Sequence, residues 1–464
     1  MTLVQIAFRN VFRNKRRSLI TVSAIGVGAL SVLIVGALLT FIVLNFQSSV
    51  VRHIGHLTVY KAGYVEYGSG DPSQYGIRHY RATISLIAHD PVLKPLIRVI
   101  TPVQDVVGLA GNFQAARSTP FFGVGVDAAQ AGLMNEWDDY GLGTGGRGRS
   151  PLPPSRTAAV VGFGLARILA ICKPLHIHNC HTQRPAPAKG SSGTADPLIT
   201  GLSKVNPAAS AAGPRREASK AVLDLLAATA GGSPNVVSVD VSRGQRQADR
   251  DVDDHYVMMH LGLAQELMYG KGVHEVTGIE LQLYHTRDMA RARARLEELF
   301  ARHHLDFEVR DFAELTPLYP QVLHFFQFIF GFISIVLAVI VVFMIINTMT
   351  MAVLERTNEI GTLRALGLQR TRVRLQFSLE GLLLGMIGAT GGAVLAELLA
   401  VLANVSHLRW TPPTASGTAP LRLLIPFWML MGTWLVLIAL ASLAAVVAAS
   451  RANRMTVVEA LRHV

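Results

Sequence analysis

Residues 351–370, MAVLERTNEIGTLRALGLQR, follow directly on forty residues, 315–354, that contain no Asp, Glu, Lys or Arg. An uncharged stretch of this length exceeds the roughly 20 apolar residues that span a bilayer core. A simple membrane anchor would end in a few basic residues. This one ends in paired charges, two glycines and further arginines, so we expect the segment to do more than anchor the chain.

Three further stretches are long and apolar enough to cross a membrane. The 464 residues are 50% hydrophobic and only 16% charged, which indicates a membrane protein with a large folded portion. We predict membrane-spanning helices at residues 19–46, 321–354, 375–403 and 423–450. The remaining segments are a short amphipathic helix at 1–18, a folded domain at 47–320, loops at 355–374 and 404–422, and a tail at 451–464.

Lysines and arginines cluster at one end of these spans. Five lie in residues 1–18, five in 355–374 and three in 451–464, against two in 404–422. Because positive residues are retained on the cytoplasmic side, we expect both termini and the 355–374 loop to be cytoplasmic and residues 47–320 to be periplasmic. The same rule explains the net charge of +12, so we expect no nucleic-acid partner.

The segment between the first two spans mixes strand and helix patterns. GHLTVYKAGY (55–64) and FFGVGVDAA (121–129) alternate like strands. Residues 276–312 have the pattern of a strand, a helix and a strand, as in a split βαβ unit. Residues 173–220, rich in Ala, Pro, Ser and Gly, are a predicted flexible insertion. The predicted fold class is an integral membrane protein with four transmembrane helices and a large extracytoplasmic α+β domain between helices one and two.

The second span is longer than a bilayer requires. From Gln321 to Leu354 it has 34 uncharged residues, about 51 Å of helix, whereas the hydrocarbon core is about 30 Å thick. We expect its outer part to project from the membrane as a stalk joined to the domain. A strong tilt of the helix is the alternative.

The chain offers no catalytic constellation. It contains no phosphate-loop, H-E-x-x-H or G-x-S-x-G motif, so we assign no catalytic, cofactor-binding or metal site. Glu380 and Glu397 lie inside the third span, where an acidic residue can mark an ion path. Their positions near the two ends of the span favour a structural role.

Both cysteines lie in CKPLHIHNCH (172–181). Because the domain should face an oxidising space, we favour a local disulfide between Cys172 and Cys180. Free thiols remain an alternative. A metal site that adds His176, His178 and His181 is another, although the spacing matches no standard zinc pattern.

The stretch quoted first has the pattern of a docking element. Glu355, Arg356 and Glu359 can share one side of a helical turn. Gly361 permits a break, and Gly367 can end the short helix that follows. A short helix lying across the cytoplasmic face suits the binding of a partner. A simple basic turn is the alternative.

Several segments resemble a known family. ERTNEIGTLRALG (355–367) closely resembles the signature of MacB/FtsX-type ABC transporter permeases. AFRNVFRNKRRS (7–18) is similar to the opening helix of that family. GHLTVY (55–60) and DDHYVMMHLGLAQELM (253–268) resemble its lipoprotein-releasing, Lol-type branch. The insertion at 173–220 shares no such resemblance.

The resemblance implies a mechanism. Two permeases, identical or different, would pair, and the short helix of each would dock on a separate ABC ATPase subunit that binds ATP and Mg²⁺. ATP-driven closure of the ATPases would then move the stalks and outer domains. The residues that correspond to the family's coupling segment are Glu355, Arg356, Glu359, Gly361, Arg364 and Gly367.

On this basis the expected function is release or export of lipoproteins, lipids or other amphiphiles from the outer leaflet of the inner membrane. A periplasmic carrier or adaptor protein and membrane lipids would be further partners. Two alternatives are a transmitter that regulates a periplasmic cell-wall hydrolase and a permease for macrolides or peptide antibiotics. The sequence leaves open the substrate and whether the paired permease is identical.

Overall fold

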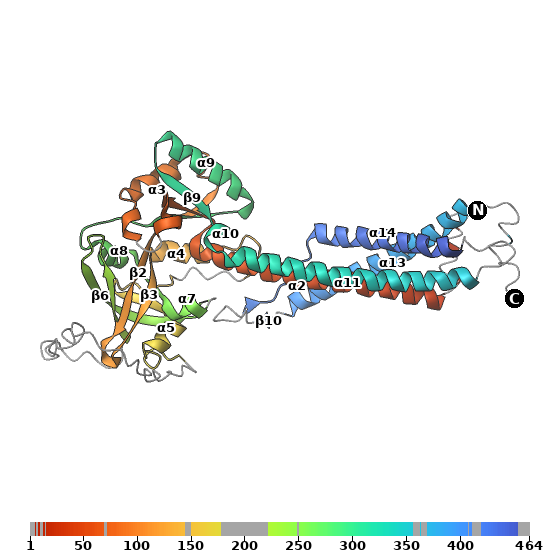
Figure 1. Cartoon of the computed structure of the whole chain (residues 1–464), viewed down its shortest axis with the longest axis horizontal. Coiled ribbons are helices and arrows are strands. Elements are labelled where there is room, and N and C mark those ends of the chain that lie inside the picture. The colour runs from red at the N-terminus through yellow and green to blue at the C-terminus, as the bar shows by residue number, and fades with distance from the viewer. Residues whose placement is uncertain are drawn as a thin grey trace, which may run out of the picture.

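The protein has an elongated shape, with a bundle of long helices at one end and a domain of strands and short helices at the other (Figure 1). We call the end of the bundle farthest from the domain the remote end. The computed structural model describes residues 5, 8–9, 13, 15–68, 72–143, 150–177, 221–247, 250–355, 362, 369–406, 408–410 and 419–452.

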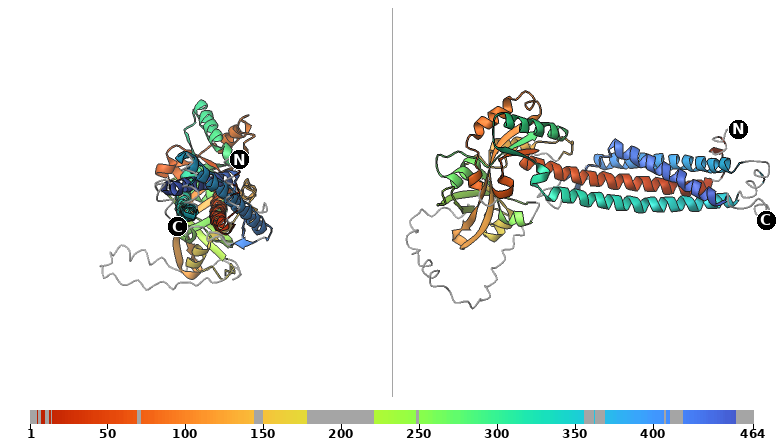
Figure 2. Two further views of the ribbon diagram at one scale, coloured as in Figure 1. Left: turned by 90° about the vertical axis from the view of Figure 1, so that its right-hand side faces the viewer. Right: turned by 45° about the horizontal axis from the view of Figure 1, so that its top comes forward.

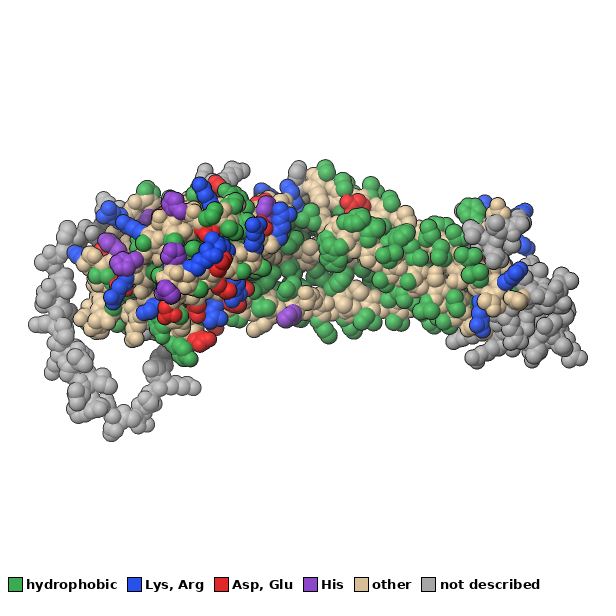
Figure 3. Space-filling view, turned by 90° about the horizontal axis from the view of Figure 1, so that it is seen from above, with side chains coloured by type: hydrophobic (Ala, Val, Ile, Leu, Met, Phe, Trp, Pro, Cys, Tyr) green, Lys and Arg blue, Asp and Glu red, His purple; other side chains and the backbone are tan. Residues whose placement is uncertain are grey.

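The bundle contains four long apolar helices where the sequence predicts membrane spans. Its helices are α2 (Lys15–Ile54), α11 (Leu318–Glu355), α13 (Arg370–Val405) and α14 (Phe427–Ala452). Each is long and apolar enough to cross a membrane. Hydrophobic side chains cover the bundle, and charged side chains gather on the domain and at the remote end (Figure 3). This band is the surface that a bilayer core requires.

Two of these helices continue into the domain. With 40 and 38 residues, α2 and α11 are about 60 and 57 Å long and lie side by side (Figures 1 and 2). The sequence predicts a stalk only for the second span and ends the first span at residue 46, just before Gln47 and Ser48. Both residues are instead buried in the structure. The stalk therefore consists of two helices.

Helix α2 ends at a glycine that the fold requires. Gly55 has a φ of +74°, and its N–H donates to the carbonyl oxygen of Val51 at 3.0 Å. A side chain there would also approach the backbone of Leu281 too closely. The chain thus changes from helix to strand within two residues, without a flexible linker.

Small residues let the bundle helices approach closely. A Cβ on Gly392 of α13 would clash with the carbonyl oxygen of Gly26 on α2, and one on Gly388 would lie 2.7 Å from the Cβ of Ile25. Gly385 of α13 is similarly close to α14. Since lipid provides no hydrophobic drive between helices, close packing of this kind holds a membrane bundle together.

The strands of the domain form one sheet. They are β1 (Leu57–Lys61), β2 (Ile97–Asn112), β3 (Arg117–Val126), β4 (Ala158–Gly162), β5 (Ala221–Ala228), β6 (Pro234–Gln245), β7 (Tyr256–His260), β8 (Gly278–Leu283) and β9 (Phe307–Asp311). Among the described residues, nine strands follow the order β3-β7-β4-β6-β5-β2-β8-β1-β9, and β2 also pairs with β3.

This extra pairing gives the sheet a barrel-like form, which corrects the plain α+β domain expected from the sequence. Residues 97–103 of β2 pair with β8, while 103–112 pair with β3 and 109–111 with β5. The six strands β2, β3, β7, β4, β6 and β5 thereby close into a ring. Such closure depends on pairings between distant segments, so alternation within one strand does not reveal it.

The remaining three strands confirm the predicted split βαβ unit. β1 lies between β8 and β9 and is antiparallel to both, and α9 (Met289–Arg302) connects them. Helices α9 and α3 (Tyr80–His89) cover one face of this sheet, from which the side chains of Val59, Ile279 and Leu281 are buried against them. The other face is polar and is turned toward the barrel-like half.

Short helices fill the rest of the domain. They are a π-helix at Tyr64–Gly68, 3₁₀ turns at Pro72–Tyr75, Phe113–Ala115 and Thr286–Asp288, and the α-helices α4 (Ala128–Asn135), α5 (Phe163–Ile168), α7 (Arg250–His255), α8 (Leu261–Tyr269) and α10 (Phe312–Leu315). Outside the domain, β10 (Arg409–Trp410) and β11 (Ala419–Pro420) pair between α13 and α14. Most of the predicted insertion, from 178 to 220, lies outside the described residues.

We predict that Gly392→Ala destabilises the bundle by about 1–3 kcal/mol, because the added methyl group must push α13 away from α2. Gly391→Ala is the matched control, since a Cβ there meets nothing within 4 Å. Thermal unfolding of the detergent-solubilised protein should show a lower midpoint for Gly392→Ala alone. Equal midpoints for the two variants would contradict the packing described.

Candidate functional site: the two ends of the stalk

The remote end of the stalk carries one of the predicted coupling residues. Glu355 is the last residue of α11, and its Oε2 accepts a hydrogen bond from Nη1 of Arg17 on α2 at 2.7 Å. The Glu355 side chain is 56% exposed, so it can be reached from outside the bundle. The ion pair joins the remote ends of both stalk helices.

The other coupling residues lie outside the described residues: Arg356, Glu359, Gly361, Arg364 and Gly367. Their grouping on a docking helix stays a prediction. The helix α13 begins at Arg370, inside the segment assigned to the loop, with Gln369 in an extended conformation before it. Of the predicted amphipathic helix at 1–18, the described positions 5, 8–9, 13 and 15–18 are helical.

At the other end, an aromatic cluster joins both stalk helices to the domain. We call Phe46, Val51, Trp137, Phe312 and Tyr319 the stalk joint. The Tyr319 ring of α11 lies 5.9 Å from Phe46 of α2 and 5.2 Å from Phe312 of α10, between ring centroids. Val51 and Trp137 are almost completely buried in the same cluster. The joint therefore fixes α2 and α11 to each other and to the domain.

His56 connects the joint to the sheet. Its N–H donates to the carbonyl oxygen of Leu281 at 2.8 Å, and its carbonyl oxygen accepts from the N–H of Phe312 at 3.2 Å. Its Nδ1 accepts from the N–H of Leu283 at 3.0 Å, so the ring proton lies on Nε2, 3.2 Å from Oγ1 of Thr286. Burial lowers the pKa of His56 to about 4, against a smaller opposing effect of Asp139.

Two long polar side chains connect the last turn of α2 to the domain. Arg52 donates through Nε to the carbonyl oxygen of Trp137 at 2.8 Å. Nε2 of Gln282 donates to the carbonyl oxygens of Val51 at 3.3 Å and Met134 at 3.0 Å. Because a buried helix end needs partners for its last carbonyl groups, these bonds stabilise the entry of α2 into the domain.

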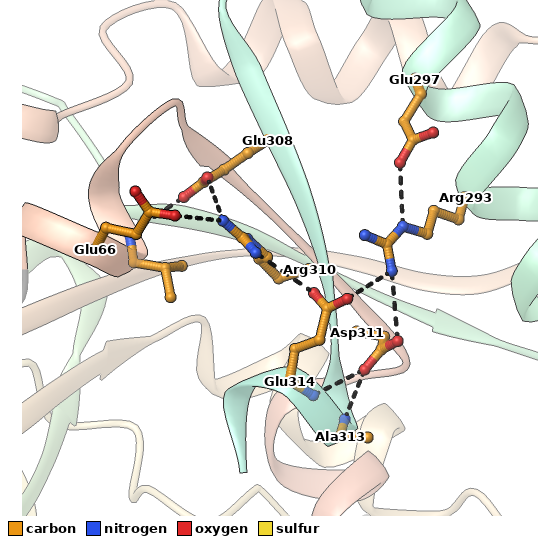
Figure 4. Close-up of polar contacts among 9 residues, drawn as sticks. Glu66, Arg293, Glu297, Glu308, Arg310, Asp311, Ala313 and Glu314 are labelled. Carbon is orange, nitrogen blue, oxygen red and sulfur yellow. Dashed lines mark hydrogen bonds and ion pairs between the residues drawn. The ribbon is translucent and has the colours of Figure 1, made fainter. Parts of the chain in front are cut away.

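An ion-pair network supports the entry of α11 (Figure 4). Arg293 of α9 binds Glu314 of α10 at 2.8 Å and Asp311 at 3.5 Å. The Asp311 carboxylate also accepts the N–H groups of Ala313 and Glu314, both at 2.9 Å, and so caps α10. Arg310 of β9 binds Glu308 at 3.0 Å. Thus α9, β9 and α10 hold one another just before α11 begins.

The cysteine and histidine cluster is only partly described. Cys172 is 5% exposed and belongs to the core of the barrel-like half. Cys180, His178 and His181 lie outside the described residues, so the disulfide stays a prediction. Within the described part of the chain, no group of three His, Cys, Asp or Glu side chains could hold a metal ion.

The two acidic residues of α13 have different surroundings. Glu380 is 5% exposed and packed inside the bundle, whereas Glu397 is exposed near the domain end of the helix. The two carboxylates therefore do not share one buried ion path through the bundle. Neither residue belongs to the stalk joint.

Sequence reasoning did not identify the stalk joint. His56 stands in a segment recognised only as a strand, and Trp137 lies in sequence without a clear pattern. Tyr319 precedes the predicted second span. The one available signal is aromatic residues close to the ends of predicted spans, which is also typical of ordinary membrane-interface residues.

Comparison with known proteins gives consistent matches. Residues 331–457 match the family described as FtsX-like permease C-terminal. The ABC transporter permease YtrF of Bacillus subtilis (strain 168) is 34% identical over 89 residues, 19% of this chain and 20% of that protein. The macrolide export ATP-binding/permease protein MacB of Escherichia coli is 26% identical over 171 residues, 36% of this chain and 26% of that protein.

The pyoverdine export ATP-binding/permease protein PvdT of Pseudomonas entomophila (strain L48) is 25% identical over 167 residues, 35% of this chain and 25% of that protein. The matches to these three relatives therefore span between a fifth and about a quarter of each relative's length.

We predict that His56 makes stability depend on pH. The unfolded chain binds a proton on this residue near its ordinary pKa of 6.5, whereas the folded chain does so only near 4. The contribution of His56 to the free energy of unfolding should thus be fully present above pH 6.5. It should fall by roughly 3 kcal/mol as the pH drops to 4.

His56→Gln should flatten this pH dependence, measured as the unfolding midpoint of the full chain in detergent between pH 4.5 and 7.5. His303→Gln, at an exposed position, should keep the wild-type dependence. The assignment to His56 fails when both variants show the same slope as the wild type.

Proposed function

Because this chain belongs to the MacB/FtsX-type family of ABC transporter permeases, we propose that it transmits ATP-driven movement through the stalk to its domain. The observation that carries the proposal is the continuity of α2 and α11 from the remote end to the stalk joint. Two packed helices of about 60 Å act as stiff rods, so a displacement at one end moves the other.

The orientation follows the distribution of basic residues. We place the remote end, with Arg17 and Glu355, in the cytoplasm, and the domain in the periplasm of a cell with an inner membrane. The hydrophobic band of Figure 3 lies between these two ends, as this arrangement requires.

The partner at the remote end would be an ABC ATPase subunit. MacB and PvdT are named as ATP-binding/permease proteins, and YtrF is named as an ABC transporter permease. In this proposal the ATPase subunit binds ATP and Mg²⁺, and the permease supplies the surface on which it docks. Glu355, Arg356, Glu359, Gly361, Arg364 and Gly367 would form the docking segment.

A second permease would pack against the bundle. One side of α11 exposes large apolar side chains at helical spacing: Phe325, Phe328, Phe332, Ile335, Val339 and Phe343. Lipid alone can cover such a face, but paired stalks need contact between two bundles. We propose α11 as the helix that borders this partner.

The substrate would be an amphiphile taken from the outer leaflet, with lipoproteins as the first candidates. The domain stands outside the membrane in this arrangement, so its movement can act on a molecule that never crosses the bilayer. A periplasmic carrier or adaptor protein would then receive it. MacB and PvdT are named for macrolide and pyoverdine export, which makes efflux of a small amphiphile the second candidate.

We predict that Gly361→Pro or Glu359→Lys abolishes association with the ATPase, because each change disrupts the docking segment while leaving the spans intact. Co-purification of the ATPase in mild detergent is the measurement, and membrane insertion is checked in parallel. Gln114→Lys, at an exposed position in the domain, introduces a lysine at the other end of the molecule and should keep the partner. Normal co-purification with both docking variants would refute the assignment.

For the complex, we predict that acylated lipoprotein stimulates ATP hydrolysis and that Tyr319→Ala removes most of this stimulation. The substitution empties the centre of the stalk joint, so binding at the domain no longer reaches the ATPase. Basal hydrolysis should remain. The exposed Tyr67→Ala serves as the control. Stimulation only by a cell-wall hydrolase, and not by lipoprotein, would favour the transmitter function instead.

A further inference from the structure

A polar cavity of about 320 Å³ lies inside the domain, next to the end of α2. Its wall combines the last turn of α2, the helix α4, the polar face of the split βαβ sheet, and strands β6 and β7. The residues that define its chemistry are Arg52, Thr101, Met134, Arg243, Met258 and Glu280.

Glu280 is the unusual member of this wall. It lies on β8 between Thr58 of β1 and Thr101 of β2, and it is only 6% exposed. Its carboxyl group makes no hydrogen bond or ion pair with any residue that the structure describes. Burial, with the nearby Asp105 as a second cause, raises the pKa of this carboxyl well above its usual range. A buried acid without a partner is unfavourable for folding alone.

A neighbouring acid shows how the same face satisfies a carboxyl group. Asp105 of β2 is also buried, yet its Oδ2 accepts a hydrogen bond from the Tyr64 hydroxyl at 2.6 Å. Glu280 has no such donor, although Thr58 and Thr101 flank it. The difference indicates that Glu280 is kept available for a group that enters the cavity.

The rest of the wall carries positive charge and apolar surface. Arg243 of β6 is exposed at the cavity, and Arg52 of α2 contributes a second guanidinium group. Met134 and Met258 supply buried, adaptable apolar contacts. A simple cation would be repelled by the two guanidinium groups, and a simple anion would leave the Glu280 carboxyl group without a cationic partner.

We propose that this cavity binds a small zwitterionic compound. Its ammonium group would pair with Glu280, its acidic group with Arg243 and Arg52, and its hydrocarbon part with Met134 and Met258. A volume of about 320 Å³ suits a molecule of the size of an amino acid or dipeptide. Arg52 also donates to the carbonyl oxygen of Trp137 in the stalk joint, so a ligand that binds Arg52 would alter a contact of the stalk. The site does not depend on the proposed transport function.

The test uses the full-length protein in detergent and two probes, O-phosphoethanolamine and alanyl-alanine, with binding measured by calorimetry. At least one zwitterion should bind about tenfold or more tightly than ethanolamine or inorganic phosphate alone, because each fragment satisfies only one side of the cavity. Glu280→Gln and Arg243→Gln should each weaken this binding about tenfold or more. The controls Glu266→Gln, at a half-buried position of α8, and Arg291→Gln, at an exposed position of α9, lie outside the cavity wall and should leave it unchanged.

Three results would overturn the proposal: no binding of either zwitterion, equal binding of phosphate alone, or unchanged affinity in Glu280→Gln. The unfolding midpoint of each variant separates lost binding from lost folding. Glu280→Gln should fold at least as stably as the wild type, because the change removes a buried ionisable group without a partner. Arg243→Gln tests the site from an exposed position even where a change at Glu280 disturbs the sheet.

Discussion

The stalk joint is the constraint on which the rest of the structure depends. A single residue with positive φ, Gly55, and the residue after it separate α2 from β1, and two residues separate α10 from α11. Neither connection is a flexible linker. The buried aromatic rings of Tyr319 and Phe312, together with the backbone bonds of His56, hold both helices against the sheet. The domain must therefore follow the stalk helices when they move.

Polar groups reinforce this connection around the aromatic cluster. Gln282 donates to a carbonyl group at the end of α2, and Arg52 of α2 donates to the carbonyl group of Trp137. Arg293 and Arg310 both pair with Glu314 and so hold α10 before α11 starts. Farther from the joint, the ion pair of Asp90 with Arg295, at 2.7 Å, ties α3 to α9. Partly buried, multiply bonded arginines hold geometry better than isolated exposed pairs do. The half of the domain that receives the stalk is thus braced by several such pairs.

The sequence predicts the parts of this fold that depend on local pattern. The four spans follow from apolar length, and the split βαβ unit follows from alternation and helical period around α9. The extension of α2 beyond Phe46 is missed because Gln47 and Ser48 suggest a boundary, although both are buried between the stalk and the domain. The closure of the barrel-like sheet is missed because β2 divides its pairing among β8, β3 and β5, which no local pattern reveals.

The same limit applies to the sites. In VTGIELQLYH, Glu280 occupies an alternate polar position that normally faces water, and only the second layer of the domain shows that it is buried. Glu355 could be identified from its place after an uncharged span, but its bond to Arg17 joins positions 338 residues apart. The docking role of Arg356, Glu359 and the residues that follow rests on the family resemblance, because they lie outside the described residues.

The two ends of the stalk differ in a way that suits transmission. Within the bundle, α2 and α11 pack through buried apolar side chains such as Ile25 and Val341. At the remote end, beyond this packing, the ion pair of Arg17 with the exposed carboxylate of Glu355 joins the two helices, a type of interaction that contributes about 0–1 kcal/mol. At the joint, the contact consists of buried aromatic and aliphatic side chains, each of which contributes several times as much, on the order of 2–4 kcal/mol. A partner that binds the remote end can therefore replace this exposed ion pair at little cost, while the packed helices and the joint stay closed. The stalk then pivots with the domain attached, instead of breaking away from it.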